Sequence, residues 1–286
     1  MKILDLNGTW NMRRTDSEES YSSEVPGGVA ATLLECGEME DPFYRENETL
    51  VQPVFEADYE FTRAFSVPPE ILSHDRILLV CNGLDTIAAI YLNGRVIAET
   101  NNMHRTYVFD VKDTLLEGEN YLAVRFSSPI RYLDAHPSKT GRKFSVIRKA
   151  ACMFGWDWGL SLPDMGIWRD IGLEAFDGAR LSRVVVRQKH VKQNVDLEID
   201  VHTDVWNKDV ETRVELLSPE GETIDCQTRI ARRVASFCMR VEHPRLWWPV
   251  GCGDQPLYSL RISLRQGKRL LDEREQKVGW RTIVLN

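Results

Sequence analysis

The sequence predicts an all-β, antiparallel protein, and the main observation behind this prediction is a repeated alternation of apolar and polar residues. In residues 195–205, apolar side chains or threonine occupy every second position, with acidic or polar residues between them. This is the pattern of a half-buried strand. Residues 122–126 and 258–264 alternate in the same way. Helical periodicity is scarce, so helices for parallel crossovers are not expected, and such strands fold as sandwiches or barrels.

Turn residues separate the predicted strands. Asn93-Gly94 predicts a two-residue hairpin turn, because both residue types tolerate the positive φ of a type I′ turn. Residues 218–221 and 266–268 predict further reversals of the chain. The best helical candidate is residues 29–36, which follow a Pro-Gly-Gly break and span about two turns at most.

The length of 286 residues corresponds to about two domains. We expect the boundary near Asp177-Gly178, where the strand-like residues 171–176 end and a new run begins. Residues 1–178 then form a domain of jelly-roll size. Residues 179–286 fit an immunoglobulin-like sandwich, whose usual size is about 100 residues.

Charge and hydropathy exclude several classes of partner. The chain has 36 Lys plus Arg against 43 Asp plus Glu, for a net charge of −7, and its basic residues are dispersed. We therefore expect no nucleic-acid surface. No stretch approaches the ~18 apolar residues of a membrane span, and the N-terminus lacks the apolar run of a secretory signal, so we expect a cytoplasmic protein.

Cysteine and histidine usage argues against a metal centre or cofactor. The six cysteines and six histidines are scattered, and no CxxC pair with metal-ligand spacing occurs. We expect reduced and mostly buried thiols, no metal and no cofactor.

The densest recognition chemistry lies in residues 154–159, Phe-Gly-Trp-Asp-Trp-Gly. A carboxylate between two aromatic faces suits a sugar, whose hydroxyls bind the acid and whose C–H groups pack on the rings. Burying Asp157 without partners would cost roughly 2–7 kcal/mol or more. We therefore name Asp157, Trp156 and Trp158 as candidate substrate-binding residues.

Structural interpretations of the same residues stay open. Trp156 and Trp158 have the size of core or domain-interface side chains. A continuous strand would send both tryptophans to one side and Asp157 to the other. Asp157 could instead cap backbone N–H groups of a turn.

Three segments resemble family 2 glycoside hydrolases. Residues 83–94 with 117–124 resemble the sugar-binding, galactose-binding-like jelly roll that opens these enzymes. Residues 148–159, together with 166–169, look like the β-mannosidase branch, and residues 243–260 are similar to its immunoglobulin-like domain. The resemblance covers essentially the whole chain.

The resemblance implies a role for each part. In β-mannosidases both catalytic glutamates lie on a (β/α)₈ barrel that follows these two domains, so no catalytic residue is nominated here. The aspartate that matches Asp157 contacts hydroxyls of the terminal mannose, and Trp156 and Trp158 would shape the same pocket. Arg148 and Lys149 either orient this loop or pair with its acid. The implied partners are a β-mannoside or related glycan and the barrel of the parent chain.

Three functions follow as hypotheses. The first is the N-terminal, non-catalytic part of a β-mannosidase-like retaining hydrolase, inactive alone. The second is a free-standing carbohydrate-binding module. The third is a structural pair of sandwiches that docks another domain.

Overall fold

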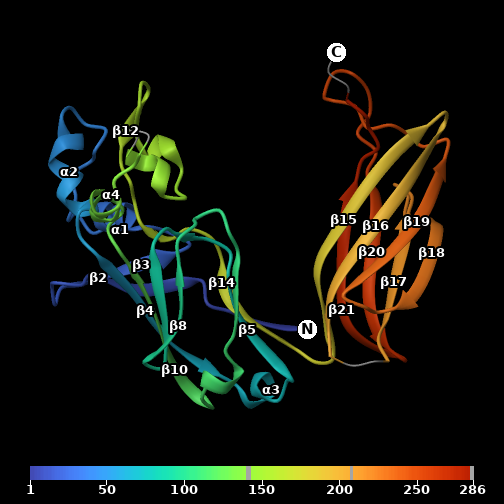
Figure 1. Cartoon of the computed structure of the whole chain (residues 1–286), viewed down its shortest axis with the longest axis horizontal. Helices are drawn as coiled ribbons and strands as arrows, with labels where there is room; N and C mark the ends of the chain where they lie inside the picture. Colours follow the sequence, from blue (N-terminus) through green and yellow to red (C-terminus); the bar gives the residue numbers. More distant parts are fainter. Residues whose placement is uncertain (140–142, 207–208, 284–286) are drawn as a thin grey trace. The chain divides into compact units, whose positions relative to one another are not determined.

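A computed structural model describes residues 1–139, 143–206 and 209–283 and divides the chain into two compact units. The first unit comprises Lys2–Ala175, and the second comprises Phe176–Asn286 together with Met1. Both consist mainly of strands (Figure 1), which confirms the predicted all-β class.

The larger sheet of the first unit has the strand order β3-β2-β4-β10-β7-β8. Its strands are β2 (Gly8–Arg14), β3 (Ser20–Val25), β4 (Tyr59–Val67), β7 (Ala88–Leu92), β8 (Arg95–Thr100) and β10 (Gly118–Phe126). Val124 in β10 lies opposite Phe61 in β4 and Ile90 in β7 in antiparallel register. All three side chains are buried, so the predicted alternation of residues 122–126 marks one face of a core sheet.

A second sheet closes the first unit. It has the order β1-β14-β5-β9 and consists of β1 (Lys2–Asp5), β5 (Arg76–Cys81), β9 (Tyr107–Asp110) and β14 (Ile171–Phe176). Ile77 and Leu79 of β5 and Leu173 of β14 belong to the same buried cluster as Phe61 and Val124 of the larger sheet. Two sheets around one core form a sandwich, which agrees with the predicted jelly roll.

Helices and short strands lie in the connections between the strands of the first unit. They are α1 (Val29–Glu35), α2 (Asn47–Phe55), α3 (Pro69–Leu72), α4 (Pro129–Ala135), η1 (Lys112–Thr114), η2 (Lys143–Val146), η3 (Ala151–Met153), β6 (Leu84–Asp85), β11 (Phe154–Trp156), β12 (Gly159–Ser161) and β13 (Gly166–Ile167). Helix α1 confirms the helix predicted at residues 29–36. Helix α2 was missed, because it contains Pro53 and buries only Val51 and Phe55.

The predicted hairpin at residues 93–94 is confirmed. Asn93 and Gly94 join β7 to β8, with φ values of 51° and 76°. Both values lie in the left-handed region that a type I′ turn requires.

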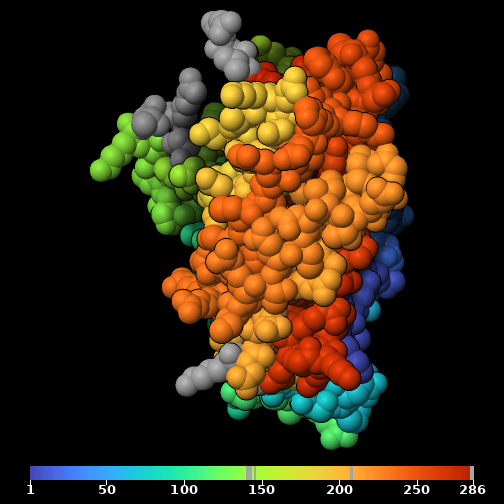
Figure 2. Space-filling model, turned by 90° about the vertical axis from the view of Figure 1, so that its right-hand side faces the viewer, coloured from blue at the N-terminus to red at the C-terminus, as the bar shows by residue number. Residues whose placement is uncertain are grey.

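The second unit is a sandwich of a three-stranded and a four-stranded sheet. The orders are β15-β16-β19 and β18-β17-β20-β21. The strands are β15 (Ala179–Val191), β16 (Asn194–Val205), β17 (Glu211–Leu217), β18 (Thr223–Ile230), β19 (Val234–Glu242), β20 (Tyr258–Gln266) and β21 (Arg269–Val278). Figure 2 faces this unit, with the β17–β19 region in orange. Three plus four strands is the composition of the constant-type immunoglobulin sandwich.

Strand β16 confirms the alternation predicted for residues 195–205. Val195, Leu197, Ile199 and Val201 are buried, while the acids between them are not. These four residues share one core with Leu260, Ile262 and Leu264 of the facing sheet, the residues on which the strand at 258–264 was predicted.

The expectation of mostly buried cysteines is wrong. Cys81 is buried, whereas Cys36, Cys152, Cys226, Cys238 and Cys252 are exposed, and all six are free thiols. Cys238, for example, occupies an outward position between the buried Phe237 and Met239 of β19. Within the described parts of the chain, no helix is long and apolar enough to cross a membrane.

Candidate functional site

The three candidate substrate-binding residues lie at the end of a short hairpin. Strands β11 and β12 pair antiparallel, with Phe154 opposite Ser161 and Trp156 opposite Gly159. Asp157 and Trp158 are therefore the two turn residues. The condition on which both tryptophans were expected on one side, a continuous strand, is not met, because β11 ends at Trp156 and period-two alternation ends where the chain turns.

The turn exposes two large aromatic side chains. Trp156 is 56% exposed and Trp158 is 78% exposed. Asp157 between them is also exposed, and its carboxylate makes no hydrogen bond or ion pair with any residue that the structure describes. The core interpretation of the tryptophans and the capping interpretation of Asp157 therefore do not apply within the first unit. Exposed aromatics beside an unpartnered acid fit a surface that contacts a ligand or another chain segment.

Lys149 does not pair with Asp157. Its side chain is fully buried, and its Nζ lies 2.5 Å from Oδ2 of Asp85 and donates to the carbonyl oxygen of Asp164 at 2.6 Å. Asp85 is 4% exposed and also accepts a hydrogen bond from the Thr86 hydroxyl. Of the two roles predicted for Lys149, orienting the loop thus remains, because a buried ammonium needs its partners close by.

Asp164 closes the other end of the segment that carries the hairpin. Its Oδ1 accepts hydrogen bonds from the backbone N–H groups of Ala30, at 3.0 Å, and Met165, at 2.8 Å. Burial raises the pKa of Asp164 to about 6, although both hydrogen bonds and the charge of Lys149 act in the opposite direction. Burial likewise lowers the pKa of Lys149, opposed by Asp85.

Arg148 lies beside Lys149 but is exposed. Its backbone forms a parallel bridge with Asn102, and its carbonyl accepts a hydrogen bond from Met103 at 3.0 Å. The indole Nε1 of Trp168 donates to the carbonyl of Met103 at 3.2 Å. Residues 102–103 thus contact the chain on both sides of the hairpin segment, through the backbone of Arg148 before it and the indole of Trp168 after it.

Sequence reasoning missed several of these contacts. Asp85 belongs to the first resembling segment, yet nothing in its spacing relates it to Lys149, 64 residues away. Glu48 and Gln52 of α2 bond to β12 and were also missed. The available signal was their separation by four residues, which places two polar side chains on one face of a helix.

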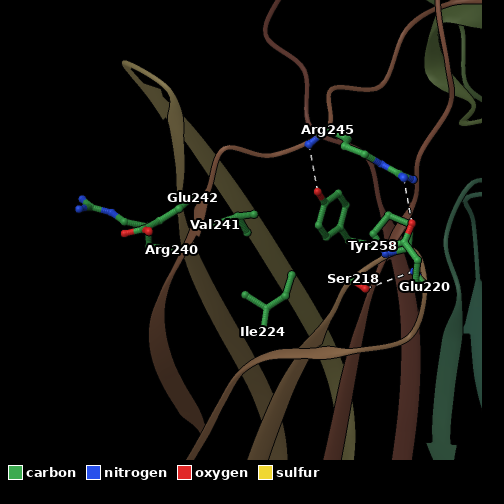
Figure 3. Close-up of a pocket in the computed structure, with 9 residues that line it drawn as sticks. Ser218, Glu220, Ile224, Arg240, Val241, Glu242, Arg245 and Tyr258 are labelled. Carbon is green, nitrogen blue, oxygen red and sulfur yellow. Dashed lines mark hydrogen bonds and ion pairs between the residues drawn. The ribbon is translucent and has the colours of Figure 1, made fainter.

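A surface pocket of about 430 Å³ lies in the second unit, lined by Ser218, Pro219, Glu220, Ile224, Arg240, Val241, Glu242, Arg245 and Tyr258 (Figure 3). Several of its polar groups already have protein partners. Arg245 pairs with Glu220 at 2.8 Å, and its N–H donates to the Tyr258 hydroxyl at 3.1 Å. Arg240 pairs with Asp196 at 2.6 Å. We therefore place the candidate site at the hairpin.

Among residues 1–139, 143–206 and 209–283, no group of three or more His, Cys, Asp or Glu side chains is arranged to hold a metal ion.

Comparison with protein families finds matches in both units. Residues 10–169 match the family described as glycosyl hydrolase 2 galactose-binding domain-like. Residues 179–281 match the family described as glycosyl hydrolases family 2.

Individual relatives agree with these matches. The chain is 28% identical to the β-mannosidase of Mus musculus, over 98% of this chain and 35% of that protein. It is 30% identical to β-mannosidase B of Thermothelomyces thermophilus, over 99% of this chain and 35% of that protein. The crystal structure of a β-D-mannosidase from Dictyoglomus thermophilum superposes with a TM-score of 0.90 at 34% identity, over 98% of this chain and 36% of that one. The chain thus spans about a third of the length of these relatives.

Proposed function

Because the chain belongs to family 2 of the glycosyl hydrolases and spans about a third of the β-mannosidases that it matches, we propose that it is the N-terminal, non-catalytic part of a β-mannosidase-like retaining hydrolase. In this proposal, residues 1–178 are the sugar-binding jelly roll and residues 179–286 are the immunoglobulin-like domain. A (β/α)₈ barrel of the same parent chain carries the catalytic acids. The substrate is a β-mannoside or a related glycan.

The observation that carries the proposal is the exposed turn of Trp156, Asp157 and Trp158. A carboxylate without a protein partner can accept hydrogen bonds from sugar hydroxyls, each worth roughly 1.5–3 kcal/mol. The two indole rings offer faces for the C–H groups of a pyranose. The hairpin would therefore complete a sugar pocket whose remaining walls come from the barrel.

The proposed role is recognition and not bond cleavage. Retaining hydrolysis requires two carboxyl groups about 5–5.5 Å apart, one acting as acid and base and the other as nucleophile. Asp157 is flanked in the chain by two tryptophans, and we assign it contacts with sugar hydroxyls alone. The isolated chain is then expected to leave nitrophenyl β-mannoside intact, and measurable hydrolysis would overturn this assignment.

The test uses the parent enzyme with Asp157→Ala. Loss of one charged hydrogen bond to the sugar predicts a fall in kcat/KM for nitrophenyl β-mannoside of about 10- to 100-fold. Glu117→Ala is the control, because Glu117 is also an exposed acid of the first unit. An unchanged kcat/KM in the Asp157→Ala enzyme would reject the proposed role.

The same exposed hairpin supports a second candidate, a free-standing carbohydrate-binding module. Titration of the isolated chain with manno-oligosaccharides separates the two. Millimolar or tighter binding that disappears in Asp157→Ala favours the module. If the isolated chain does not bind but Asp157→Ala lowers kcat/KM of the parent enzyme, the result favours a pocket that the barrel completes. If the isolated chain does not bind and kcat/KM is unchanged, a purely structural docking role is left.

A further inference from the structure

Helix α2 holds both backbone groups of one residue in the hairpin. The N–H of Ser161 in β12 donates to Oε1 of Glu48 at 2.7 Å. The carbonyl oxygen of Ser161 accepts a hydrogen bond from Nε2 of Gln52 at 2.8 Å. A hairpin residue whose amide and carbonyl are both bonded to another element has little freedom to shift along its strand.

The helix that makes these contacts is itself anchored. Glu48 and Gln52 are four residues apart and so lie on the same face of α2. Gln52 also donates to the carbonyl of Glu48 at 2.8 Å, which restricts the rotamers of the amide that contacts Ser161. Val51 is 3% exposed and Phe55 is 0% exposed, and both belong to the core of the first unit. The helix therefore connects the hairpin to the sandwich.

The base of the hairpin segment is closed independently of α2. Lys149 stands before the hairpin and Asp164 after it, and the Lys149 ammonium donates to the Asp164 carbonyl at 2.6 Å. Asp85 holds the same ammonium from β6. The segment between residues 149 and 164 thus has a fixed base, and the contacts of α2 with Ser161 support it nearer the turn.

The exposed turn has few supports of its own. An isolated two-stranded hairpin is marginally stable in water, and β11 and β12 have three residues each. Phe154 stacks on Phe144 with ring centroids 6.2 Å apart, on the side of the hairpin where β11 begins. Beyond these residues, the position of Asp157 depends on how firmly β12 is held.

We propose that Glu48 and Gln52 are positioning residues for sugar recognition: through the backbone of Ser161 they fix the direction in which Trp156, Asp157 and Trp158 project. This inference rests on the proposed function for its consequence in catalysis, but the mechanical role of α2 stands on the contacts themselves. A site residue held about 1 Å out of place loses much of its binding contribution, which is why such supports matter.

The first experiment measures the hairpin directly in this chain. Amide hydrogen exchange of residues 154–160 is compared between the native sequence and the double variant Glu48→Ala/Gln52→Ala. Loss of two hydrogen bonds, one of them to a carboxylate, predicts exchange at least about tenfold faster. A 5-fluorotryptophan label should show shifted ¹⁹F resonances for Trp156 and Trp158, assigned with Trp156→Phe and Trp158→Phe.

Two variants separate positioning from a general loss of stability. Glu48→Gln keeps an oxygen acceptor for the Ser161 N–H and should return exchange and ¹⁹F shifts most of the way to native values. Glu56→Ala removes an exposed acid that follows α2 and should change neither. Native exchange rates and ¹⁹F shifts in the double variant would overturn the proposal.

The second experiment tests the consequence in the parent enzyme. Glu48→Ala/Gln52→Ala should lower kcat/KM for nitrophenyl β-mannoside by about tenfold, with Glu48→Gln restoring most of it. If Asp157→Ala has no effect on kcat/KM, the proposed function fails whatever α2 does. If Asp157→Ala has its expected effect but the double variant has none, the positioning role fails and the proposed function stands.

Discussion

The segment from Lys149 to Asp164 has two ends of opposite character. At its base, the Lys149 ammonium is fully buried and bonded to Asp85 and to the Asp164 carbonyl. At its tip, Trp156 and Trp158 are 56% and 78% exposed, and Asp157 is exposed as well. The charged groups at the base are thus buried and paired, whereas the aromatic side chains at the tip are exposed.

This difference indicates that the two ends have different roles: the contacts at the base stabilise the fold, and the side chains at the tip are accessible to a ligand. A buried ion pair has a large desolvation cost, so removing one member leaves an uncompensated charge and is strongly destabilising. An exposed side chain contributes little to the free energy of unfolding, and its removal is usually within about 0.5 kcal/mol of neutral. We therefore expect substitutions at the base to change stability and substitutions at the tip to change sugar recognition.

The largest effect is expected for Lys149→Met. It keeps side-chain volume but leaves Asp85 charged and buried without its partner, so the free energy of unfolding of the first unit should fall by about 3–5 kcal/mol. Urea denaturation followed by circular dichroism measures it.

The controls for Lys149→Met use the same measurement. Lys268→Met, in an exposed turn, should be nearly neutral. The double variant Lys149→Met/Asp85→Asn should recover part of the loss, because it removes the unpaired charge. A loss below about 1 kcal/mol in Lys149→Met would contradict the structural importance of the base.

Two glycines sharpen the comparison between base and tip. A Cβ at Gly28 would overlap with the Asp164 carboxylate, whereas a Cβ at Gly159 would meet no atom within 4 Å. Gly28→Ala should therefore destabilise the first unit by about 1–3 kcal/mol, and Gly159→Ala should change its stability by less than about 0.5 kcal/mol. The same urea denaturation experiment measures both variants, and equal losses of stability in the two would contradict the difference between base and tip.

The base should also respond to pH. Because the pKa of Asp164 is raised from its usual 3.8 to about 6, the folded chain binds more protons than the unfolded chain between these values. The contribution of Asp164 to stability is thus fully present below about pH 4 and falls as pH rises to about 6.

Urea denaturation of the native chain and of the Asp164→Asn variant at pH 4.5 and pH 7 tests the direction of this pH dependence. The stability of the native chain relative to the Asn variant should decrease toward pH 7, because the variant does not titrate there. An increase would mean that Lys149 and the two backbone donors outweigh the desolvation of Asp164.

The smallest effect on stability is expected at the tip. Asp157→Ala and Trp158→Ala should each change the free energy of unfolding by less than about 0.5 kcal/mol. A loss above about 1 kcal/mol in either variant would show that the tip stabilises the fold, against the division proposed here.

Much of the fold is predictable from the sequence because periodicity reports burial directly. The alternation from Val195 to Val201 predicts one buried face of β16, and Asn93-Gly94 predicts the turn between β7 and β8. Helix α2 escaped prediction because Val51 and Phe55 are its only buried residues and Pro53 argues against a helix.

The candidate site was predictable in its residue types but not in its arrangement. Trp156, Asp157 and Trp158 stand together in the sequence, so an acid flanked by aromatics is visible without a structure. That Asp157 and Trp158 form the turn, and that both tryptophans are exposed, depends on where β11 ends.

The sequence by itself determined that this protein is built from antiparallel strands and that residues 154–159 place an acid between two tryptophans. Only the tertiary structure decided that Lys149 pairs with Asp85 and that Glu48 and Gln52 hold Ser161. The physical reason is that local patterns report which face of an element is buried, whereas the partner of a buried charge or backbone group depends on which distant segments the fold brings together.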